Sequence, residues 1–246
     1  MERMIHMNTP KYRRVLVKIS GEALAGEAGR GLDFSVIGPV CDVLKQCVEA
    51  GVQVAVVVGG GNIWRGLKDG GSRMERTRAD QMGMLATVIN ALGLADALEQ
   101  RGCPARVQTA LSMPTVAEPY IRNKAVSHLE KGRVVIFGCG TGNPYFSTDT
   151  GAVLRGIEIS ADAVLLAKNI DGVYDADPRT NPNARRFDAI TYDDVLARHL
   201  AATDLTAISL AMDNRMPLAL FALEDPQNIY RVIMGEDIGT IIKEAI

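Results

Sequence analysis

The stretch Phe137–Thr150, with the sequence FGCGTGNPYFSTDT, carries residues that are well suited to binding a phosphate-bearing ligand. Three glycines within five residues are followed by an aromatic pair, and then by Ser, Thr and Asp where a helical pattern begins. Glycines let the backbone approach a ligand closely, and a helix start offers unpaired N–H groups that suit an anion. The aromatic rings could stack on a flat base. A glycine turn with Ser147 or Thr148 as the helix N-cap explains the same residues, so both interpretations stay open here.

Lys18 is a second candidate, because it stands near the end of an apolar run. The run Arg14–Ile19 is rich in β-branched residues and predicts a strand. A lysine within a buried run is costly unless its charge is paired. At the carboxyl edge of an open α/β sheet its ammonium could reach the phosphates of a ligand. Alternatively, it is a strand-end lysine whose ammonium simply extends to water.

A second glycine-rich segment, Gly59–Asn62, follows a predicted strand at residues 52–58. A strand, a triple glycine and a short helix form a pattern typical of phosphate-binding backbones. The segment is not a Walker A loop, because the chain contains no G-x-x-x-x-G-K-[ST] sequence. It also breaks the dinucleotide-binding fingerprint, which disfavours a nicotinamide-dependent oxidoreductase. Arg65 could clamp phosphate oxygens or could be an ordinary surface arginine.

Two further places allow both a functional and a structural interpretation. Asp80 falls in the first turn of a helix predicted from Ala79, where the helix dipole favours a carboxylate, although the same side chain could bind a sugar hydroxyl. The segment Lys168–Pro178 contains a tyrosine and several side-chain acceptors among turn signals. It could form a purine pocket or could be merely a polar connection.

The elements that must position these residues alternate between strand and helix. Strands are predicted at 14–19, 52–58, 105–109, 133–137, 161–167, 217–223 and 239–242, the last at the sheet edge. Helices are predicted at 33–50, 79–100, 118–131, 148–160, 192–200, 204–214 and 227–234. This alternation predicts an α/β fold, a three-layer α/β/α sandwich with a central, mostly parallel sheet. We expect a flexible lead-in over residues 1–11 and a single domain over 12–246, with lobes at about 12–160 and 161–246.

Composition narrows the class of protein. The chain has 246 residues, of which 47% are hydrophobic and only 5% aromatic, so aliphatic side chains must fill the core. That composition suits a parallel sheet covered by helices on both faces. A net charge of −2 and the lack of a long apolar run argue against nucleic-acid and membrane partners. The chain contains 4 cysteines, without C-x-x-C spacing, which predicts reduced thiols in a cytoplasmic protein.

Five motifs, taken in order, resemble those of the bacterial uridylate (UMP) kinases of the amino acid kinase superfamily. They are Lys18-Ile-Ser-Gly-Glu-Ala-Leu, Gly59-Gly-Gly-Asn-x-x-Arg65-Gly, Asp80-x-Met-Gly-Met-Leu-Ala-Thr87, Gly140-Thr-Gly-Asn-Pro-x-Phe146-x-Thr-Asp149 and Asp171-Gly-Val-x-x-Ala-Asp177-Pro. The match runs from Tyr12 to Ile242. The resemblance implies an amino acid kinase-like fold and transfer of the γ-phosphoryl group of ATP to UMP, giving UDP and ADP. It also implies that Mg²⁺ accompanies ATP.

The resemblance also implies roles for individual residues. The expected catalytic residues are Lys18, which bridges the phosphates, Asp149, which orients Lys18 or the metal, and Asp204, which gives polar support. The expected ATP-binding residues are Lys18, Ile19, Ser20, Gly21, Gly61, Arg65, Lys168, Asn169, Tyr174 and Asp177. The expected UMP-binding residues are Gly60, Asp80, Thr141, Gly142, Asn143, Pro144, Tyr145, Phe146, Ser147 and Thr148. No residue is assigned as a direct metal ligand.

Regulation and assembly are implied by the resemblance alone. The family suggests a homohexamer built from dimers, activation by GTP and inhibition by UTP. The effector loop would consist of Gly26, Glu27, Ala28, Gly29, Arg30 and Gly31. Three features depart from the family pattern: Tyr145 stands where phenylalanine is common, and both the Lys168-Asn169 pair and the effector loop vary among members. Which atoms of the Lys168-Asn169 pair face adenine therefore stays open.

Two other functions fit parts of the sequence less well. A superfamily member that phosphorylates a carboxylate or carbamate would lack the pattern of residues 141–148 and the helix motif that begins at Asp80. A nucleotide-sensing regulatory protein with decayed catalysis would have lost Lys18 or Asp149, and both are present.

Overall fold

The computed structural model describes residues 9–65, 69, 74–200 and 203–245. The predicted flexible lead-in, residues 1–11, therefore lies outside the described residues up to position 8. At its end, the backbone N–H of Lys11 donates to the carbonyl of Ile233 at 3.0 Å. The chain is thus attached to the rest of the structure just before the first strand.

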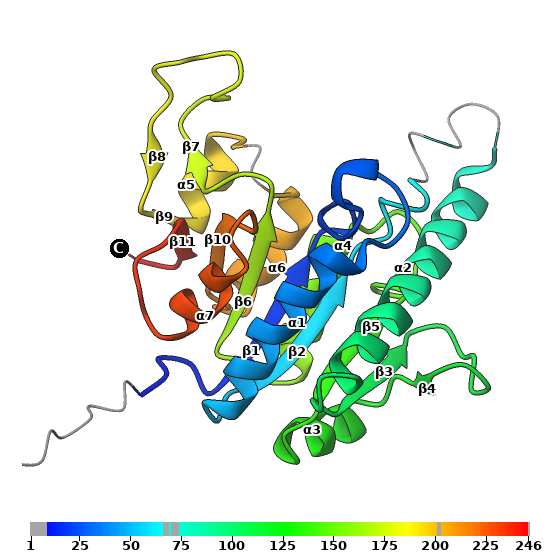
Figure 1. Cartoon of the computed structure of the whole chain (residues 1–246). Coiled ribbons are helices and arrows are strands. Elements are labelled where there is room, and N and C mark those ends of the chain that lie inside the picture. Colours follow the sequence, from blue (N-terminus) through cyan, green and yellow to red (C-terminus); the bar gives the residue numbers. More distant parts are fainter. Residues whose placement is uncertain (1–8, 66–68, 70–73, 201–202, 246) are drawn as a thin grey trace, which may run out of the picture.

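A single sheet of nine strands forms the centre of the described structure (Figure 1). Its order is β4 (Glu118–Pro119), β3 (Ala105–Thr109), β5 (Val134–Gly138), β2 (Gln53–Val58), β1 (Arg14–Ile19), β6 (Ala163–Lys168), β10 (Leu218–Ala222), β11 (Thr240–Lys243) and β9 (Ala189–Thr191). All neighbours from β4 to β10 pair in parallel, whereas β11 runs antiparallel to β10. The mostly parallel sheet predicted from the sequence is confirmed.

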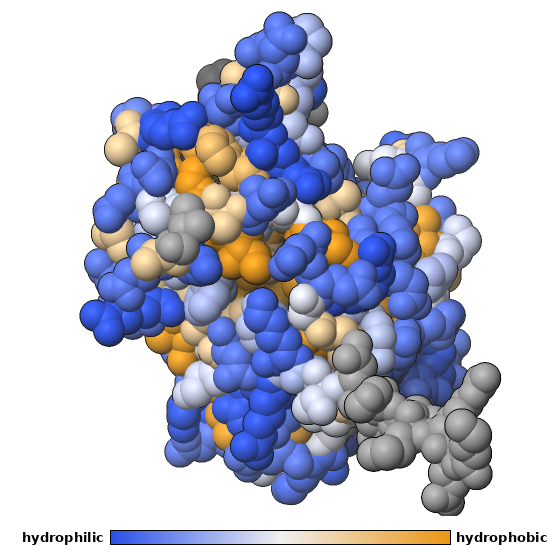
Figure 2. Space-filling model, turned by 90° about the vertical axis from the view of Figure 1, so that its left-hand side faces the viewer, coloured by the Kyte–Doolittle hydropathy of each residue, from blue (hydrophilic) through white to orange (hydrophobic). Residues whose placement is uncertain are grey.

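Helices cover both faces of this sheet and complete three layers (Figure 1). One face packs against α1 (Phe34–Glu49), α2 (Arg76–Glu99) and α7 (Gln227–Ile233). The other face packs against α3 (Arg122–Glu130), α4 (Thr148–Glu158), α5 (Tyr192–Ala197) and α6 (Leu205–Asp213). The predicted α/β/α sandwich is therefore confirmed. The side of the molecule shown in Figure 2 is mostly hydrophilic, with hydrophobic residues gathered near its middle.

Strand alternation decides which layer the strand lysines face. In β1, Val15 and Val17 pack into the core under α1, whereas Leu16 packs into the core under α4. Successive side chains in a strand point to opposite faces, so Lys18 shares the face of Leu16. In β6, Leu166 packs on the α4 side, and the same rule places Lys168 there. Both lysines consequently point toward the start of α4.

Several predicted boundaries are wrong, for local reasons. The edge strand expected at 239–242 is not at the edge, because Ala189–Thr191 pair with Ile241–Lys243 outside it. The helix expected at 118–131 begins only at Arg122, after the short strand that ends in Pro119, a residue without an N–H for a helix ladder. The helix expected from 79 begins at Arg76, because the Glu75 carboxylate caps it by accepting from two backbone N–H groups.

Short elements escaped the sequence patterns altogether. The hairpin of β7 (Val173–Tyr174) and β8 (Arg186–Phe187) has strands too short to show a period. Two 3₁₀ turns, Gly21–Leu24 and Gly26–Ala28, occupy the segment after β1, and the second lies within the loop expected at residues 26–31.

Helix α2 alone, among the described residues, is long and apolar enough to cross a membrane. This differs from the expectation that no apolar run reaches that length. In its most apolar stretch, 50% is buried inside the protein. The length and composition of α2 are therefore weak evidence for a membrane span, because a helix in a protein core can have the same length and composition.

Candidate active site

Four parallel strands bring the candidate residues to one edge of the sheet. β1, β2, β5 and β6 all run in the same direction, so the segments that follow them meet at their carboxyl ends, where open α/β sheets bind ligands. Two hollows open there, a larger cavity of about 930 Å³ and a smaller one of about 320 Å³. Their lining divides the residues predicted from the sequence into two groups.

The larger cavity collects most of the residues expected to bind ATP. These are Lys18, Ser20, Lys168, Asn169, Tyr174 and Asp177. Residues that the sequence did not single out also line it, among them Glu22, Arg179, Arg198, His199 and Glu224. The side chain of Ile19 differs from the prediction, because strand alternation turns it into the core under α1, where it is fully buried.

The smaller cavity collects the residues expected to bind UMP. These are Gly60, Asp80, Thr141, Asn143, Phe146, Ser147 and Thr148. Gly61 and Arg65, which we expected on the ATP side, line this cavity instead, and the sequence reading missed Trp64, Met84, Thr87, Cys139 and Gly140. Gly142, Pro144 and Tyr145 belong to the same loop but are not part of this lining. Tyr145 is 67% exposed.

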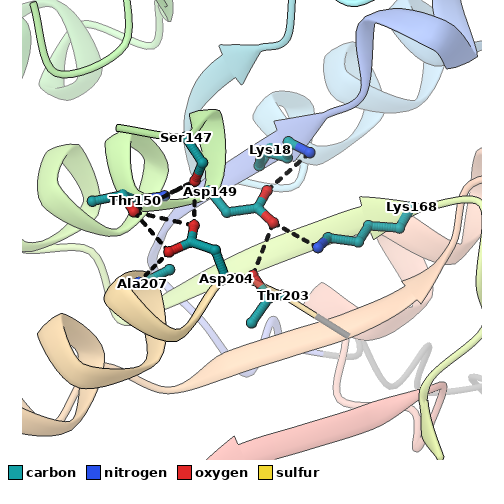
Figure 3. A network of polar contacts seen from close by, with 8 residues as sticks. All are labelled: Lys18, Ser147, Asp149, Thr150, Lys168, Thr203, Asp204 and Ala207. Carbon is teal, nitrogen blue, oxygen red and sulfur yellow. Dashed lines mark hydrogen bonds and ion pairs between the residues drawn. The ribbon is translucent and has the colours of Figure 1, made fainter. Parts of the chain in front are cut away.

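Asp149 lies at the centre of a buried cluster of charges (Figure 3). The ammonium of Lys18 lies 2.9 Å from its Oδ1, and the ammonium of Lys168 donates to its Oδ2 at 2.6 Å. The hydroxyl of Thr203 also donates to Oδ2, at 2.8 Å. Lys18 is 8% exposed and Asp149 is 9% exposed. One carboxylate therefore fixes both lysines that line the larger cavity.

The charges in this cluster shift one another's pKa. Burial alone raises the pKa of Asp149, but Lys18 and Lys168 outweigh that effect and hold the pKa well below its ordinary value. Burial lowers the pKa of Lys168, and the neighbouring ammonium of Lys18 lowers it further, while Asp149 opposes both effects. Asp149 is consequently ionised near neutral pH and is a poor proton acceptor.

Asp204 bonds to groups beside this cluster and makes no direct hydrogen bond to Asp149 in the described residues. It is the N-cap of α6, where it accepts from the backbone N–H of Ala207 at 2.9 Å. Its carboxylate also accepts from the hydroxyls of Thr150, at 3.1 Å, and of Ser147. Ser147 in turn caps α4 by accepting from the backbone N–H of Thr150 at 3.0 Å. Asp204 thus links two helix N-termini, and the catalytic role expected for it stays a prediction.

Thr203 had no signal in the sequence, although it touches Asp149. It immediately precedes the cap residue of α6, and its hydroxyl reaches Asp149 only because the start of α6 packs against the start of α4. Thr203 is 8% exposed. A hydroxyl that becomes important through a tertiary contact of this kind cannot be recognised from residue spacing.

Asp80 connects helix α2 to the loop that lines the smaller cavity. Its Oδ2 accepts from the backbone N–H of Tyr145 at 2.8 Å and from Nε of Arg76 at 2.7 Å. The Arg76 guanidinium lies over the Tyr145 ring, 5.0 Å from its centre. Because α2 begins at Arg76, Asp80 is in the second turn rather than the first, so the helix-dipole interpretation has less support.

The expected effector loop contacts the triple-glycine segment. The backbone N–H of Gly31 donates to the carbonyl of Asn62 at 3.0 Å, and the Asn62 amide donates back to the carbonyl of Gly31 at 2.5 Å. Asn62 is also hydrogen-bonded to Asn90 of α2. On the other side of this segment, Arg65 forms an ion pair with Glu22. Gly31, at the end of the expected effector loop, is therefore hydrogen-bonded to the residue that follows Gly60 and Gly61, which line the smaller cavity.

The donor groups fit a metal ion that arrives with phosphates. The described residues contain no cluster of three or more His, Cys, Asp or Glu side chains that could cage a metal. Oδ1 of Asp149 is buried and receives no hydrogen bond from the described residues, because the ammonium of Lys18 is close to it but not aligned for one. Mg²⁺ commonly binds through substrate phosphates and one or two carboxylates, a mode to which Oδ1 of Asp149 can contribute if its contact with the Lys18 ammonium rearranges.

Comparisons with known proteins agree with this arrangement. The family model described as the amino acid kinase family matches residues 13–232. The crystal structure of UMP kinase from Bacillus anthracis is similar, with 38% identity, 96% of this chain and 97% of that chain covered, and a TM-score of 0.92. UMP kinase from Ureaplasma parvum has 35% identity over 94% and 99% of the two chains and a TM-score of 0.89. Uridylate kinase from Archaeoglobus fulgidus has 27% identity over 93% and 99%, and a TM-score of 0.72.

We predict that Asp149→Asn destabilises the fold in a pH-dependent way. At neutral pH the variant leaves two buried ammonium groups without their counter-charge, at a cost of about 3 kcal/mol. The folded pKa of Asp149 lies below its ordinary value of 3.8, so its contribution is complete above that pH and is lost as the pH falls toward the folded pKa. The free energy of unfolding of wild type and variant should therefore differ by a constant amount above about pH 5, and the difference should narrow as the pH falls below about 4.

Calorimetric unfolding at a series of pH values from about 7 downward measures the difference in the free energy of unfolding between wild type and variant. Leu166→Ala is the control, because it removes buried apolar surface beside the cluster without removing a titrating group. Its stability difference from wild type should not change with pH. If the difference for Asp149→Asn is also independent of pH, the assigned ion pairs are contradicted.

Proposed function

The chain belongs to the amino acid kinase family, among its UMP kinases, and we propose that it transfers the γ-phosphoryl group of ATP to UMP, giving UDP and ADP. The observation that carries this proposal is the position of the Lys18–Asp149–Lys168 cluster. Lys18 and Lys168 line the larger cavity, and Asp149 directly follows Ser147 and Thr148, which line the smaller one. Phosphates bound in the two cavities would meet at this cluster.

We assign ATP to the larger cavity and UMP to the smaller. Asn169, Tyr174 and Asp177 would surround the base and ribose of ATP, with its phosphates directed toward Lys18. On the acceptor side, Phe146 is 53% exposed beside the small cavity, where its ring is free to lie against a pyrimidine. Asp80 would bind the ribose of UMP with the lone pairs left over from its two present hydrogen bonds.

The transfer step needs alignment and charge neutralisation more than covalent help. The acceptor phosphate of UMP has a second pKa of about 6, so it is a nucleophile near neutral pH without a general base. This agrees with an Asp149 that is held ionised by two ammonium groups and cannot readily take a proton. Its role would be to orient Lys18, whose charge would stabilise the transferring group.

Lys168 takes a different role from the one expected for it. Its ammonium donates to Asp149, so we assign it to the phosphate side of the ATP site rather than to adenine. Two ammonium groups and one carboxylate leave one net positive charge in the cluster. That excess favours a polyanionic ligand such as a triphosphate.

Mg²⁺ would enter with ATP, held mainly by the phosphates, with Oδ1 of Asp149 as the protein oxygen best placed to take part. When bound, the ion neutralises charge on the β- and γ-phosphates. The residues of this chain would position the phosphates around it.

Regulation is a second part of the proposal. GTP would activate and UTP would inhibit, acting through residues 26–31. Support comes from the hydrogen bonds between Gly31 and Asn62, because Asn62 belongs to the glycine segment beside the smaller cavity. A change in this loop would thus be transmitted to the acceptor side. Assays with added GTP and UTP test this, and unchanged rates with both nucleotides would remove the regulatory role.

We further propose a cytoplasmic homohexamer built from dimers. Helix α2, on the right-hand side of Figure 1, exposes Met82, Leu85, Ile89 and Leu92 by 38%, 49%, 52% and 38%. These side chains recur at three- and four-residue spacing and form one apolar stripe, which suits packing against a second copy of this helix. All four cysteines are free and buried, which suits a reducing compartment.

We predict that the protein forms UDP from UMP and ATP, with poor use of CMP and AMP. A coupled assay of ADP release across these nucleoside monophosphates measures the preference directly. Chromatography of the products identifies the diphosphate and separates transfer from simple ATP hydrolysis. Equal rates on CMP and UMP would contradict the proposed acceptor.

Lys18→Met keeps most of the side-chain volume but removes the charge. We expect kcat to fall by about 100- to 1,000-fold, because one preorganised donor to the transferring phosphoryl group is lost. The fold should remain, since a neutral side chain at this position no longer needs a buried counter-charge. The matched control is Lys45→Met on α1, a lysine that bonds the carbonyl of Arg101, which should retain full activity. A small effect of Lys18→Met would remove Lys18 from the mechanism.

The double variant Leu85→Asp/Ile89→Asp places two charges within the apolar stripe of α2. We expect it to reduce the assembled mass, because desolvating two carboxylates disfavours helix packing across an interface. Light scattering after size-exclusion chromatography measures the mass. Ile121→Asp, at an apolar side chain that is 46% exposed at the start of α3, on the other face of the sheet from α2, is the control for one added surface charge. A double variant with the wild-type mass would contradict α2 as the contact.

A further inference from the structure

Arg155 is a buried arginine for which neither the sequence patterns nor the proposed transfer step gives a reason. It lies on α4, faces away from the Lys18–Asp149–Lys168 cluster and is only 5% exposed. A buried guanidinium is costly unless its charge and its donors are satisfied. The contacts that satisfy it should therefore indicate what it does.

Two contacts hold Arg155, and a third joins the two residues that it contacts. Its NH1 pairs with Oε2 of Glu158 at 2.5 Å, and its guanidinium lies over the ring of Tyr120, 4.0 Å from the ring centre. The Tyr120 hydroxyl donates to the same Oε2 of Glu158 at 2.7 Å. Burial and this hydrogen bond raise the pKa of Tyr120, so its phenol stays protonated as the donor. Arg155, Glu158 and Tyr120 thus form a closed group of three side chains.

A second nitrogen of Arg155 reaches the loop of the smaller cavity. Its NH2 donates to the carbonyl oxygen of Gly140 at 3.2 Å. Gly140 lines that cavity, and its backbone rests on α4, where a Cβ added to Gly151 would lie 3.2 Å from the Gly140 Cα. Tyr120 also packs edge-on against Phe137, the residue of β5 that leads toward the same loop, with ring centres 5.4 Å apart. The three side chains therefore contact the loop through Gly140 and Phe137 without lining the smaller cavity themselves.

We propose that Arg155 is a positioning residue for the acceptor pocket, which fixes the carbonyl of Gly140 and thereby the first turn of the loop that lines the smaller cavity. The proposal rests on the proposed function only for the identity of the acceptor. Arg155 touches neither cavity, so it acts through the loop backbone. Its loss should affect the acceptor side and leave the ATP side, which is built from β1, β6 and the β7–β8 hairpin, unchanged.

Arg155→Lys tests this by keeping the charge and removing the planar donor set. A lysine can pair with Glu158 or reach Gly140, but it cannot do both while it stacks on Tyr120. We expect KM for the acceptor nucleotide to rise about tenfold, with KM for ATP and kcat within about twofold of wild type. Arg122→Lys is the matched control, because this exposed arginine bonds the carbonyl of Glu158 at the end of α4, and its kinetic constants should not change.

Two further measurements keep the test decisive. Tyr120→Leu leaves the arginine paired with Glu158 but removes the ring beneath it, and should raise KM for the acceptor by a smaller factor. Amide hydrogen exchange of the free protein should be faster in the 138–146 segment of Arg155→Lys and unchanged in the 163–168 strand. This exchange result needs no substrate, so it distinguishes failure of the positioning role from failure of the proposed function. Equal rises in both KM values, or unchanged exchange in 138–146, would overturn the proposal.

Discussion

The structure around the site depends on keeping one carboxylate, that of Asp149, buried between two ammonium groups. Each of these charges would be costly to bury alone; the carboxylate is paired with both ammonium groups, and each ammonium is paired with the carboxylate. The requirement constrains several parts of the fold at once: β1 and β6 must present their lysines on the same face, α4 must begin beside them, and the segment that leads into α6 must supply the hydroxyl of Thr203. The paired caps Ser147 and Asp204 hold α4 and α6 in that arrangement.

The same arrangement explains why two cavities meet at one point. The larger cavity lies over the ends of β1 and β6, and the smaller cavity lies between α2 and the loop that follows β5. Helix α4 begins between the two cavities. Its first residue, Thr148, lines the smaller cavity, and the next residue, Asp149, pairs with the two lysines that line the larger one. A bimolecular transfer between two anions gains from such a layout, because it fixes both partners before reaction and offsets their mutual repulsion.

Much of this was accessible from the sequence. The alternation of strands and helices predicts the three layers, and strand period and chain direction place Lys18 at the functional edge of the sheet. The loop 138–148 was also recognised from its residue types, whereas the role of Asp149 was expected only from the resemblance to the UMP kinases. Residues that act through tertiary contacts were not. Thr203 and Arg155 have no spacing signal, because their partners are 54 and 15 residues away in sequence. The sequence placed Lys168 in the ATP site but left open which atoms of the Lys168-Asn169 pair face adenine, and its ion pair with Asp149 was not foreseen because the two residues are 19 apart in sequence.

Short elements could not be predicted from the sequence for a related reason. β9 has three residues, too few for alternation to be seen, and its pairing with β11 is set by the packing of the whole C-terminal half. The start of α2 was missed because its cap is the glutamate Glu75 rather than one of the usual short polar residues.

The most direct test of the central claim is a crystal structure with UMP and a non-hydrolysable ATP analogue bound together. The account predicts UMP in the smaller cavity, the analogue in the larger one, and the γ-phosphate facing the UMP phosphate beside the Lys18 ammonium, with Asp149 still bound to both lysines. Phosphates that lie in separate regions, with Lys18 contacting neither, would contradict it.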